Sequence, residues 1–324
     1  MRSSFSKVEL ELDPFVPYLP FATGHTQTVL GHIVPSEKTH FGFDSQVLTL
    51  PDGDELLLEY VDNQSAYTVS LYHGLAGDAQ SDYIRRSAIL AQRLGWNIVQ
   101  VNHRGIRTHA RQTYHSGRGE DASEVIKWCR QRFPDTQQIA VGFSMSGSIL
   151  LNLLSLRYGE EQPDYAVVVN APLDLAKSAR LLSAGFSRVY DMRFCLLLKK
   201  MIEERKGEKV HVPLWARTTD IDDWYTSKLN GFADALDYYT QCSSMNYVDR
   251  IQTKTFVLSS YDDPFIDVQD YLTAPWSSSV HLSLQRYGGH MGYFSKQKNT
   301  SYGRRWLDHY LESVFCKILK SSFE

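Results

Sequence analysis

The sequence predicts an α/β fold with a mainly parallel sheet, helices on both of its faces and one long insertion. Short β-rich runs alternate with longer amphipathic stretches along most of the chain, and this alternation is typical of parallel strands joined by crossover helices. The alternation stops between Ala171 and about Arg250, in a long stretch rich in Leu, Lys and Tyr. We therefore expect a single domain over residues 1–324, with residues 171–250 inserted as a candidate cap.

The predicted strands begin with an antiparallel hairpin and continue as six strands that can all run parallel. The turn Pro51-Asp52-Gly53 joins the arms of the hairpin, because Pro, Asp and Gly favour tight turns. The strands are predicted over residues 43–50, 56–60, 67–72, 97–102, 138–142, 165–170, 255–259 and 279–284.

The predicted helices end at residues that stop a helix. Residues 81–94 end at Gly95, residues 119–133 at Pro134 and residues 146–158 at Gly159. Residues 192–206 are predicted as a helix inside the insertion. The last predicted helix, residues 302–319, carries two adjacent apolar rows that indicate packing on the sheet: Trp306, Tyr310 and Val314, beside Leu307, Leu311 and Phe315.

Composition excludes several classes of function. The 34 basic and 37 acidic side chains give a net charge of −3, without the basic excess that a nucleic-acid-binding protein needs. The four cysteines are far apart and form no CxxC pair, so neither a zinc site nor a disulfide framework is expected. We expect no metal and no cofactor.

The amino terminus and the hydropathy pattern indicate a cytoplasmic protein. Residues Met1 to Lys7 meet Glu9, Glu11 and Asp13 instead of the apolar region of a secretory signal. No run of about 18 uninterrupted apolar residues occurs, so no transmembrane segment is predicted.

The segment 138–147 has the pattern of a nucleophile elbow, in which a sharp strand-to-helix turn lifts a serine hydroxyl above the sheet. A β-rich run leads into Gly142-Phe143-Ser144-Met145-Ser146-Gly147, and an apolar helix follows. This context presents Ser144. Ser146 stands where the pattern G-x-S-x-G has its last glycine, and the alternative is an ordinary helix start with Ser144 or Ser146 as the N-cap.

Nucleotide-binding loops do not explain the same residues. After Gly142 and Gly147, a phosphate loop requires Lys and then Ser or Thr, whereas Ser148 and Ile149 follow here. The dinucleotide pattern G-x-G-x-x-G is absent from every strand-to-helix junction.

A glycine-containing loop after the strand 67–72, His73-Gly74-Leu75-Ala76-Gly77, is typical of an oxyanion hole. An anionic tetrahedral intermediate needs preorganised donors, and the backbone amides of Leu75 and Met145 are the expected pair. The alternative is a simple strand-exit turn with His73 packed beside it.

An acid and a histidine follow two later strands. Asp263 comes after the strand 255–259 and directly before Pro264, with Asp262 as the alternative acid or an Asp-Pro turn as the structural explanation. His290 lies on the glycine-flanked loop 288–292 after the last strand. The chain order Ser144, Asp263, His290 is the order of a triad on the α/β-hydrolase fold, which makes this fold our specific prediction.

With these residues in place, the sequence resembles the YheT-type branch of the α/β hydrolases over nearly its whole length. The animal relatives in this branch include membrane-anchored lipid esterases and phospholipases, and we expect this chain to lack their amino-terminal anchor. Ser146 is the main departure, since the branch normally has glycine there. The matching segments are 15–17, Gly24-His25-Thr26-Gln27-Thr28, 73–77, 102–105, 142–145, 222–226, 231–232, 238–239, 262–265 and 288–292.

The sequence therefore predicts a serine esterase that cleaves carboxylic esters through an acyl-enzyme on Ser144, His290 and Asp263. Its expected substrate is a small-molecule acyl ester, with lipids among the candidates. The triad fixes acyl transfer but not the leaving group, so a thioesterase, an amidase, a lipase and a non-catalytic binding protein on the same fold stay open.

Overall fold

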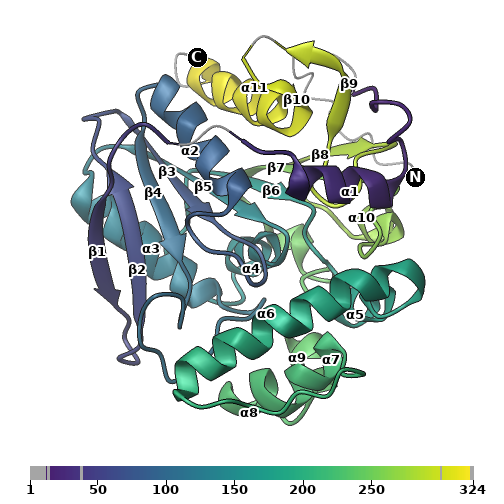
Figure 1. The fold of residues 1–324 in the computed structure, drawn as a ribbon. Coiled ribbons are helices and arrows are strands. Elements are labelled where there is room, and N and C mark those ends of the chain that lie inside the picture. Colours follow the sequence, from purple (N-terminus) through teal and green to yellow (C-terminus); the bar gives the residue numbers. More distant parts are fainter. Residues whose placement is uncertain (1–11, 13–14, 37–38, 300, 322–324) are drawn as a thin grey trace.

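The computed structural model describes residues 12, 15–36, 39–299 and 301–321, and it contains a central sheet with helices on both faces (Figure 1). Eight strands pair in the order β1-β2-β4-β3-β5-β6-β7-β8. β1 and β2 form the predicted hairpin, β2 pairs antiparallel with β4, and the strands from β4 to β8 are parallel. The strands are β1 (Asp44–Thr49), β2 (Glu55–Val61), β3 (Tyr67–Tyr72), β4 (Asn97–Asn102), β5 (Gln137–Phe143), β6 (Tyr165–Val169), β7 (Lys254–Ser260) and β8 (Val280–Gln285).

Side chains alternate between the two faces of this sheet because successive residues of a strand point to opposite sides. In β6, Ala166 and Val168 join one buried cluster, whereas Val167 and Val169 join the other. Helices α3 (Gly119–Arg132) and α4 (Met145–Leu154) cover the first face, and α2 (Asp82–Arg93) and α11 (Trp306–Ser321) cover the second. The predicted fold class is confirmed.

Some predicted bounds differ from the structure. The last helix begins at Trp306 and not at residue 302, because residues 303–305 pair as β10 (Gly303–Arg305) with an unpredicted strand, β9 (Phe294–Asn299). The apolar rows of α11 pack in the core as expected. α4 ends at Leu154, four residues early, because Leu156 and Gly159 have positive φ angles of 58° and 87°.

The segment between β6 and β7 is mostly helical and lies across the carboxyl ends of the strands (Figure 1). It contains α5 (Leu175–Leu182), the 3₁₀ turn η1 (Gly185–Ser187), α6 (Arg188–Lys206), α7 (Thr218–Ile221), the π-helical turn η2 (Asp222–Thr226), α8 (Ser227–Leu229), α9 (Ala235–Cys242) and the 3₁₀ turn η3 (Val248–Arg250). Two further short helices, α1 (Gly24–Ile33) and α10 (Val268–Thr273), were not predicted.

No helix within the described ranges is both long and apolar enough to cross a membrane. The amino-terminal residues on which the absence of a secretory signal was predicted, Met1 to Lys7 with Glu9, Glu11 and Asp13, lie outside those ranges.

The parallel strands bring the predicted site residues to one edge of the sheet. β3, β5, β7 and β8 all run in the same direction, so the segments that follow them lie at the same edge. Leu75 follows β3, Ser144 follows β5, Asp263 follows β7 and His290 follows β8.

Candidate active site

Ser144 sits at the turn between β5 and α4 in a strained backbone conformation. Its φ is 52° and its ψ is −120°, a region that L-residues rarely adopt without support from their surroundings. Two glycines allow the close approach of strand and helix. A Cβ on Gly147 would lie 2.6 Å from that of Ala171, and one on Gly142 would lie 2.5 Å from the carbonyl oxygen of Ser146.

The side chain of Ser146 points away from these contacts into a buried polar network. Its hydroxyl donates to the carbonyl oxygen of His73 and lies 2.7 Å from Nε2 of His103. The His103 backbone amide in turn donates to Nε2 of His73, at 3.4 Å. Ser146 therefore ties the elbow to the loop that begins at His73, while Gly147 provides the close packing.

A chain of hydrogen bonds joins Ser144, His290 and Asp263. Ser144 Oγ lies 2.9 Å from His290 Nε2, and His290 Nδ1 lies 2.8 Å from Asp263 Oδ2. With the proton on Nδ1, the imidazole donates to the carboxylate and accepts from the serine hydroxyl. Asp263 and His290 are buried, so water competes little for these bonds.

Asp263 is held by donors on both of its oxygens. Oδ1 accepts from the backbone amides of Phe265 and Ile266, at 3.1 and 3.2 Å. Oδ2 accepts from Nδ2 of Asn170, at 2.7 Å, as well as from His290. Sequence reasoning missed Asn170; its position at the end of β6, at the same sheet edge, was the available signal.

The alternative acid, Asp262, has another partner. Its Oδ1 accepts from the backbone amide of Gly289, at 2.9 Å, so Asp262 holds the loop that carries His290. Among the described residues, Asp262 makes no hydrogen bond to the imidazole. Burial raises the pKa of Asp262.

Helix α1, which contains the segment 24–28, braces the same loop. The Thr28 hydroxyl accepts from the backbone amide of His290, at 2.9 Å, and donates to the Gly24 carbonyl, at 2.7 Å. A Cβ on Gly24 would collide with the carbonyl of Asp262, and one on Gly289, where φ is 56°, would collide with the carbonyl of Gly24. The unusual amino-terminal segment thus packs directly on the loops of the acid and the histidine.

The two amides predicted as oxyanion donors lie in the loop after β3 and at the start of α4. Gly74 N donates to the hydroxyl of Tyr83, at 2.9 Å, and Ala76 N donates to that of Tyr114, at 2.8 Å. Between them, the amide of Leu75 makes no hydrogen bond to any described residue, and neither does the amide of Met145 at the start of α4.

Comparisons with known proteins identify the family of the chain. The family model for the alpha/beta hydrolase fold matches residues 67–297. The chain belongs to this family. It is also 33% identical to YheT of Escherichia coli (strain K12) over 328 residues, which cover 93% of this chain and 95% of YheT.

Two further proteins are similar to the chain in sequence or in fold. It is 28% identical to the medium-chain fatty acid ethyl ester synthase/esterase 2 of Saccharomyces cerevisiae, over 77% of this chain and 62% of that protein. The esterase Pf2001 of Pyrococcus furiosus superposes with a TM-score of 0.62 at 16% identity, over 90% of this chain and 96% of that chain. The YheT-type branch of the alpha/beta hydrolases, predicted from the sequence, is confirmed.

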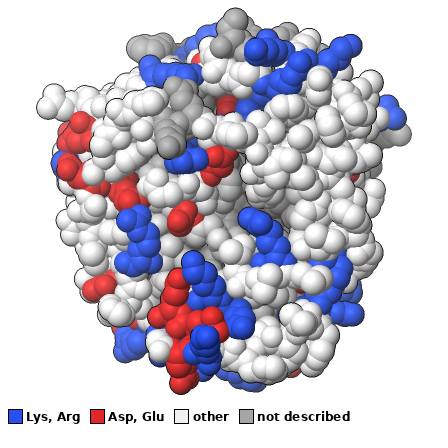
Figure 2. Space-filling view, in the orientation of Figure 1, with Lys and Arg blue, Asp and Glu red and all other residues white. Residues whose placement is uncertain are grey.

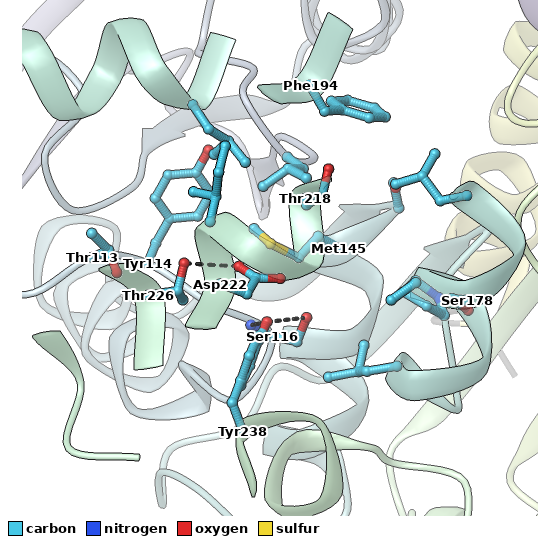
Figure 3. Close-up of a pocket in the computed structure, with 18 of the residues that line it drawn as sticks. Thr113, Tyr114, Ser116, Met145, Ser178, Phe194, Thr218, Asp222, Thr226 and Tyr238 are labelled. Carbon is cyan, nitrogen blue, oxygen red and sulfur yellow. Dashed lines mark hydrogen bonds between the residues drawn. The ribbon is translucent and has the colours of Figure 1, made fainter. Parts of the chain in front are cut away.

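In this alpha/beta hydrolase, a mostly apolar cavity of about 160 Å³ adjoins Ser144 and His290. Figure 3 shows part of its lining, including Met145 and Phe194. Met145 and Leu75 line it on the side of the sheet. The helices of the insertion supply the opposite wall, which includes Leu175, Ala179, Leu182, Phe194, Leu198 and Ile202.

Several polar side chains also line the cavity, and Asp222 is one of them. Asp222, in the π-helical turn η2, accepts from the Thr226 hydroxyl at 2.8 Å and from the Tyr239 hydroxyl at 2.6 Å (Figure 3 draws the first bond). Burial raises the pKa of Asp222 to about 6. These residues belong to the segments 222–226 and 238–239 that resemble the YheT-type branch, and the structure brings them together as one hydrogen-bonded cluster.

The described residues contain no group of three or more His, Cys, Asp or Glu side chains that could hold a metal ion. All four cysteines are free thiols; Cys129, Cys195 and Cys242 are buried and Cys316 is partly buried.

Proposed function

We propose that this alpha/beta hydrolase is a serine esterase that cleaves carboxylic esters through an acyl-enzyme on Ser144. The observation that carries the proposal is the continuous hydrogen-bonded relay from Ser144 Oγ through His290 to Asp263, with links of 2.9 and 2.8 Å. Nucleophile, base and orienting acid lie within hydrogen-bonding reach of one another, as acyl transfer of this type requires.

In the first half of the reaction, Ser144 Oγ attacks the ester carbonyl carbon while its proton moves to His290 Nε2. The carbonyl oxygen becomes an oxyanion, and the amides of Leu75 and Met145 are its proposed donors. The intermediate collapses, the carbon–oxygen bond to the alcohol breaks, and His290 returns the proton to the leaving alkoxide. Asp263 stabilises the imidazolium and keeps Nδ1 as the donor.

In the second half, a water molecule attacks the acyl-enzyme and gives its proton to His290. Collapse of the second intermediate returns that proton to Ser144 and releases the carboxylic acid. Every step uses only side chains and amides of this chain, with water as the co-substrate.

The substrate side of the proposal rests on the cavity and on the relatives. Residues 171–250 act as a cap on a single domain, and their apolar wall accepts the acyl chain of the ester. The name of the yeast relative describes it as both a synthase and an esterase of medium-chain fatty acid ethyl esters, which favours an ester of an aliphatic acid here as well.

A fluorophosphonate probe tests the nucleophile. We expect the probe to label the wild-type protein on Ser144, which peptide mass spectrometry locates, and we expect Ser144→Ala to abolish labelling with an unchanged melting temperature. Ser148→Ala is the matched control, since Ser148 lies on the same helix and bonds to the Pro172 carbonyl. A wild-type protein that stays unlabelled while binding acyl ligands would instead be a non-catalytic member of the fold.

A substrate panel tests the leaving group. Esters, thioesters and amides of the same acyl chain, at short and long chain lengths, separate an esterase from a thioesterase, an amidase or a lipase. We expect the highest kcat/KM for esters of intermediate aliphatic acids. Faster turnover of thioesters or amides would overturn the ester assignment and leave the triad in place.

A further inference from the structure

Helix α6 carries apolar side chains on two opposite faces. Phe194, Leu198 and Ile202 line the cavity beside Ser144. On the other face, Val189, Met192 and Leu196 are 56%, 46% and 62% exposed. A surface helix usually has one apolar stripe, which it buries in the core. The outer row of α6 therefore has no partner within the described chain.

Exposed apolar side chains on α1 continue this row. The Phe186 ring, just before α6, is exposed and lies 4.8 Å from the ring of His25 on α1. The Tyr190 hydroxyl donates to the His25 carbonyl at 3.2 Å, so the two helices are in direct contact. Farther along α1, Val29 and Ile33 are exposed, Ile33 by 65%.

We call these exposed apolar side chains the apolar rim. The space-filling view shows the surface hollowed between α1 and α6 (Figure 2). The rim consists of Val29, Ile33, Phe186, Val189, Met192 and Leu196.

The charges beside the rim are mainly positive. α6 contains six Lys and Arg side chains and three acids, in the sequence RVYDMRFCLLLKKMIEERK. Arg193 is exposed on the outer face, with no ion pair to any described residue, and Lys200 follows on the same face, where it pairs with Glu204 at 3.5 Å. The acid nearest the start of the row, Asp191, is buried and paired with Arg188 at 2.6 Å. The remaining acids, Glu203 and Glu204, lie at the carboxyl end of the helix.

We propose that the apolar rim docks on an anionic lipid surface. Apolar side chains flanked by cations are the combination that holds an interfacial helix in a layer of anionic lipid headgroups. A second copy of the chain fits less well, because a two-fold contact through the same face would bring the cations of both copies together. A lipid surface supplies the opposite charge.

Docking on this face would place the lipid layer one helix diameter from the cavity that contains Ser144. The outer row of α6 would lie in the layer and the inner row would face the acyl site. This consequence rests on the proposed function, but the docking itself does not, because none of the rim residues takes part in the chemistry.

Vesicle sedimentation tests the docking with the full chain. We expect the wild-type protein to bind phosphatidylcholine vesicles that contain about one third phosphatidylglycerol at about 0.1 M salt, and to bind pure phosphatidylcholine more weakly. Leu196→Asp should lower the partition coefficient at least about tenfold. Leu236→Asp is the control, because Leu236 on α9 is 63% exposed and lies outside the rim.

Three further arms separate the alternatives. Met192→Asp should repeat the loss if Leu196→Asp fails to fold, and Arg193→Glu should lower binding to anionic vesicles more than to neutral ones. Ser144→Ala should bind vesicles as the wild type does, so that failure of the catalytic proposal leaves this result unchanged. Absent vesicle binding, equal binding by Leu196→Asp, or a dimer in size-exclusion chromatography that Leu196→Asp disrupts would each overturn the proposal.

Discussion

The amide of Asn170 donates to Oδ2 of Asp263 at 2.7 Å, and the same oxygen accepts from His290. The Tyr293 hydroxyl donates to Oδ1 of Asn170 at 3.0 Å, which fixes the orientation of the amide. Asn170 has a φ of 47°, a conformation that asparagine tolerates better than most residues. Asn170 is thus a positioning residue for the acid of the relay.

Replacing Asn170 by Asp should impair turnover without unfolding the protein. A second carboxylate beside Asp263 favours the imidazolium form of the base, so the acid limb of the kcat/KM profile should move to higher pH. We expect kcat at neutral pH to fall by about 10- to 100-fold, part of the effect of losing a general base altogether. The pH profile is the deciding measurement. If Asn170 had only a structural role, the substitution would lower the melting temperature and leave the acid limb of the kcat/KM profile at the same pH.

Replacing Ser146 by Ala should destabilise the fold. Burial lowers the pKa of His73 to about 4 and holds that of His103 well below its ordinary value, so both rings are neutral around the Ser146 hydroxyl. Removing that hydroxyl leaves the His73 carbonyl and His103 Nε2 with only their longer mutual contact of 3.3 Å, at a cost of about 0.5–1.5 kcal/mol in the free energy of unfolding.

Ser155→Ala is the matched control for this change, read by urea denaturation. Ser155 is also fully buried, but its hydroxyl has no hydrogen-bond partner within the described chain. We expect Ser155→Ala to be neutral or stabilising. An equal loss of unfolding free energy in both variants would mean that the Ser146 hydroxyl does not stabilise the His73–His103 network.

Replacing Thr28 by Val should slow catalysis, although Thr28 lies on α1, which contributes no side chain to the relay. The change keeps the shape of the side chain but removes the acceptor for the His290 backbone amide. We expect kcat to fall several-fold with KM unchanged, because the imidazole is held less firmly over Ser144. Thr26→Val is the control: Thr26 lies on the same helix, and its hydroxyl donates to the Thr23 carbonyl, so this change should alter stability and not kcat.

Replacing Asp222 by Asn should stabilise the protein in a pH-dependent way. Burial raises the pKa of the folded-state carboxyl to about 6 from its ordinary value of 3.8. Between these values the folded protein binds a proton that the unfolded chain does not, so the contribution of Asp222 to stability falls as the pH rises through this window.

The asparagine variant lacks this titration. Its melting temperature relative to the wild type should therefore increase between about pH 4 and pH 6 and then stay constant. A difference that is flat from pH 4 to pH 8 would show that the carboxyl of Asp222 keeps its ordinary affinity for protons in the folded state.

Much of the fold followed from the sequence because local patterns dictate it. Short β-rich runs specified the strands of the parallel sheet, and helix-stopping residues such as Gly95 and Pro134 bounded the helices that cover it. The predicted start of the last helix was wrong because strand pairing overrides the local helix preference there. Residues 303–305 pair with β9 instead of starting the helix.

By itself, the sequence also determined which residues could form a relay, because Ser144, Asp263 and His290 each follow a strand and occur in the order that this fold requires. Only the tertiary structure decided that Asp263 and not Asp262 faces the imidazole, that Asn170 and Thr28 brace the relay, and that Ser146 joins two histidines. These contacts connect residues 27 to 262 positions apart in the chain. No periodicity or motif in the sequence predicts such contacts, because they depend on which loops the sheet and the insertion bring together.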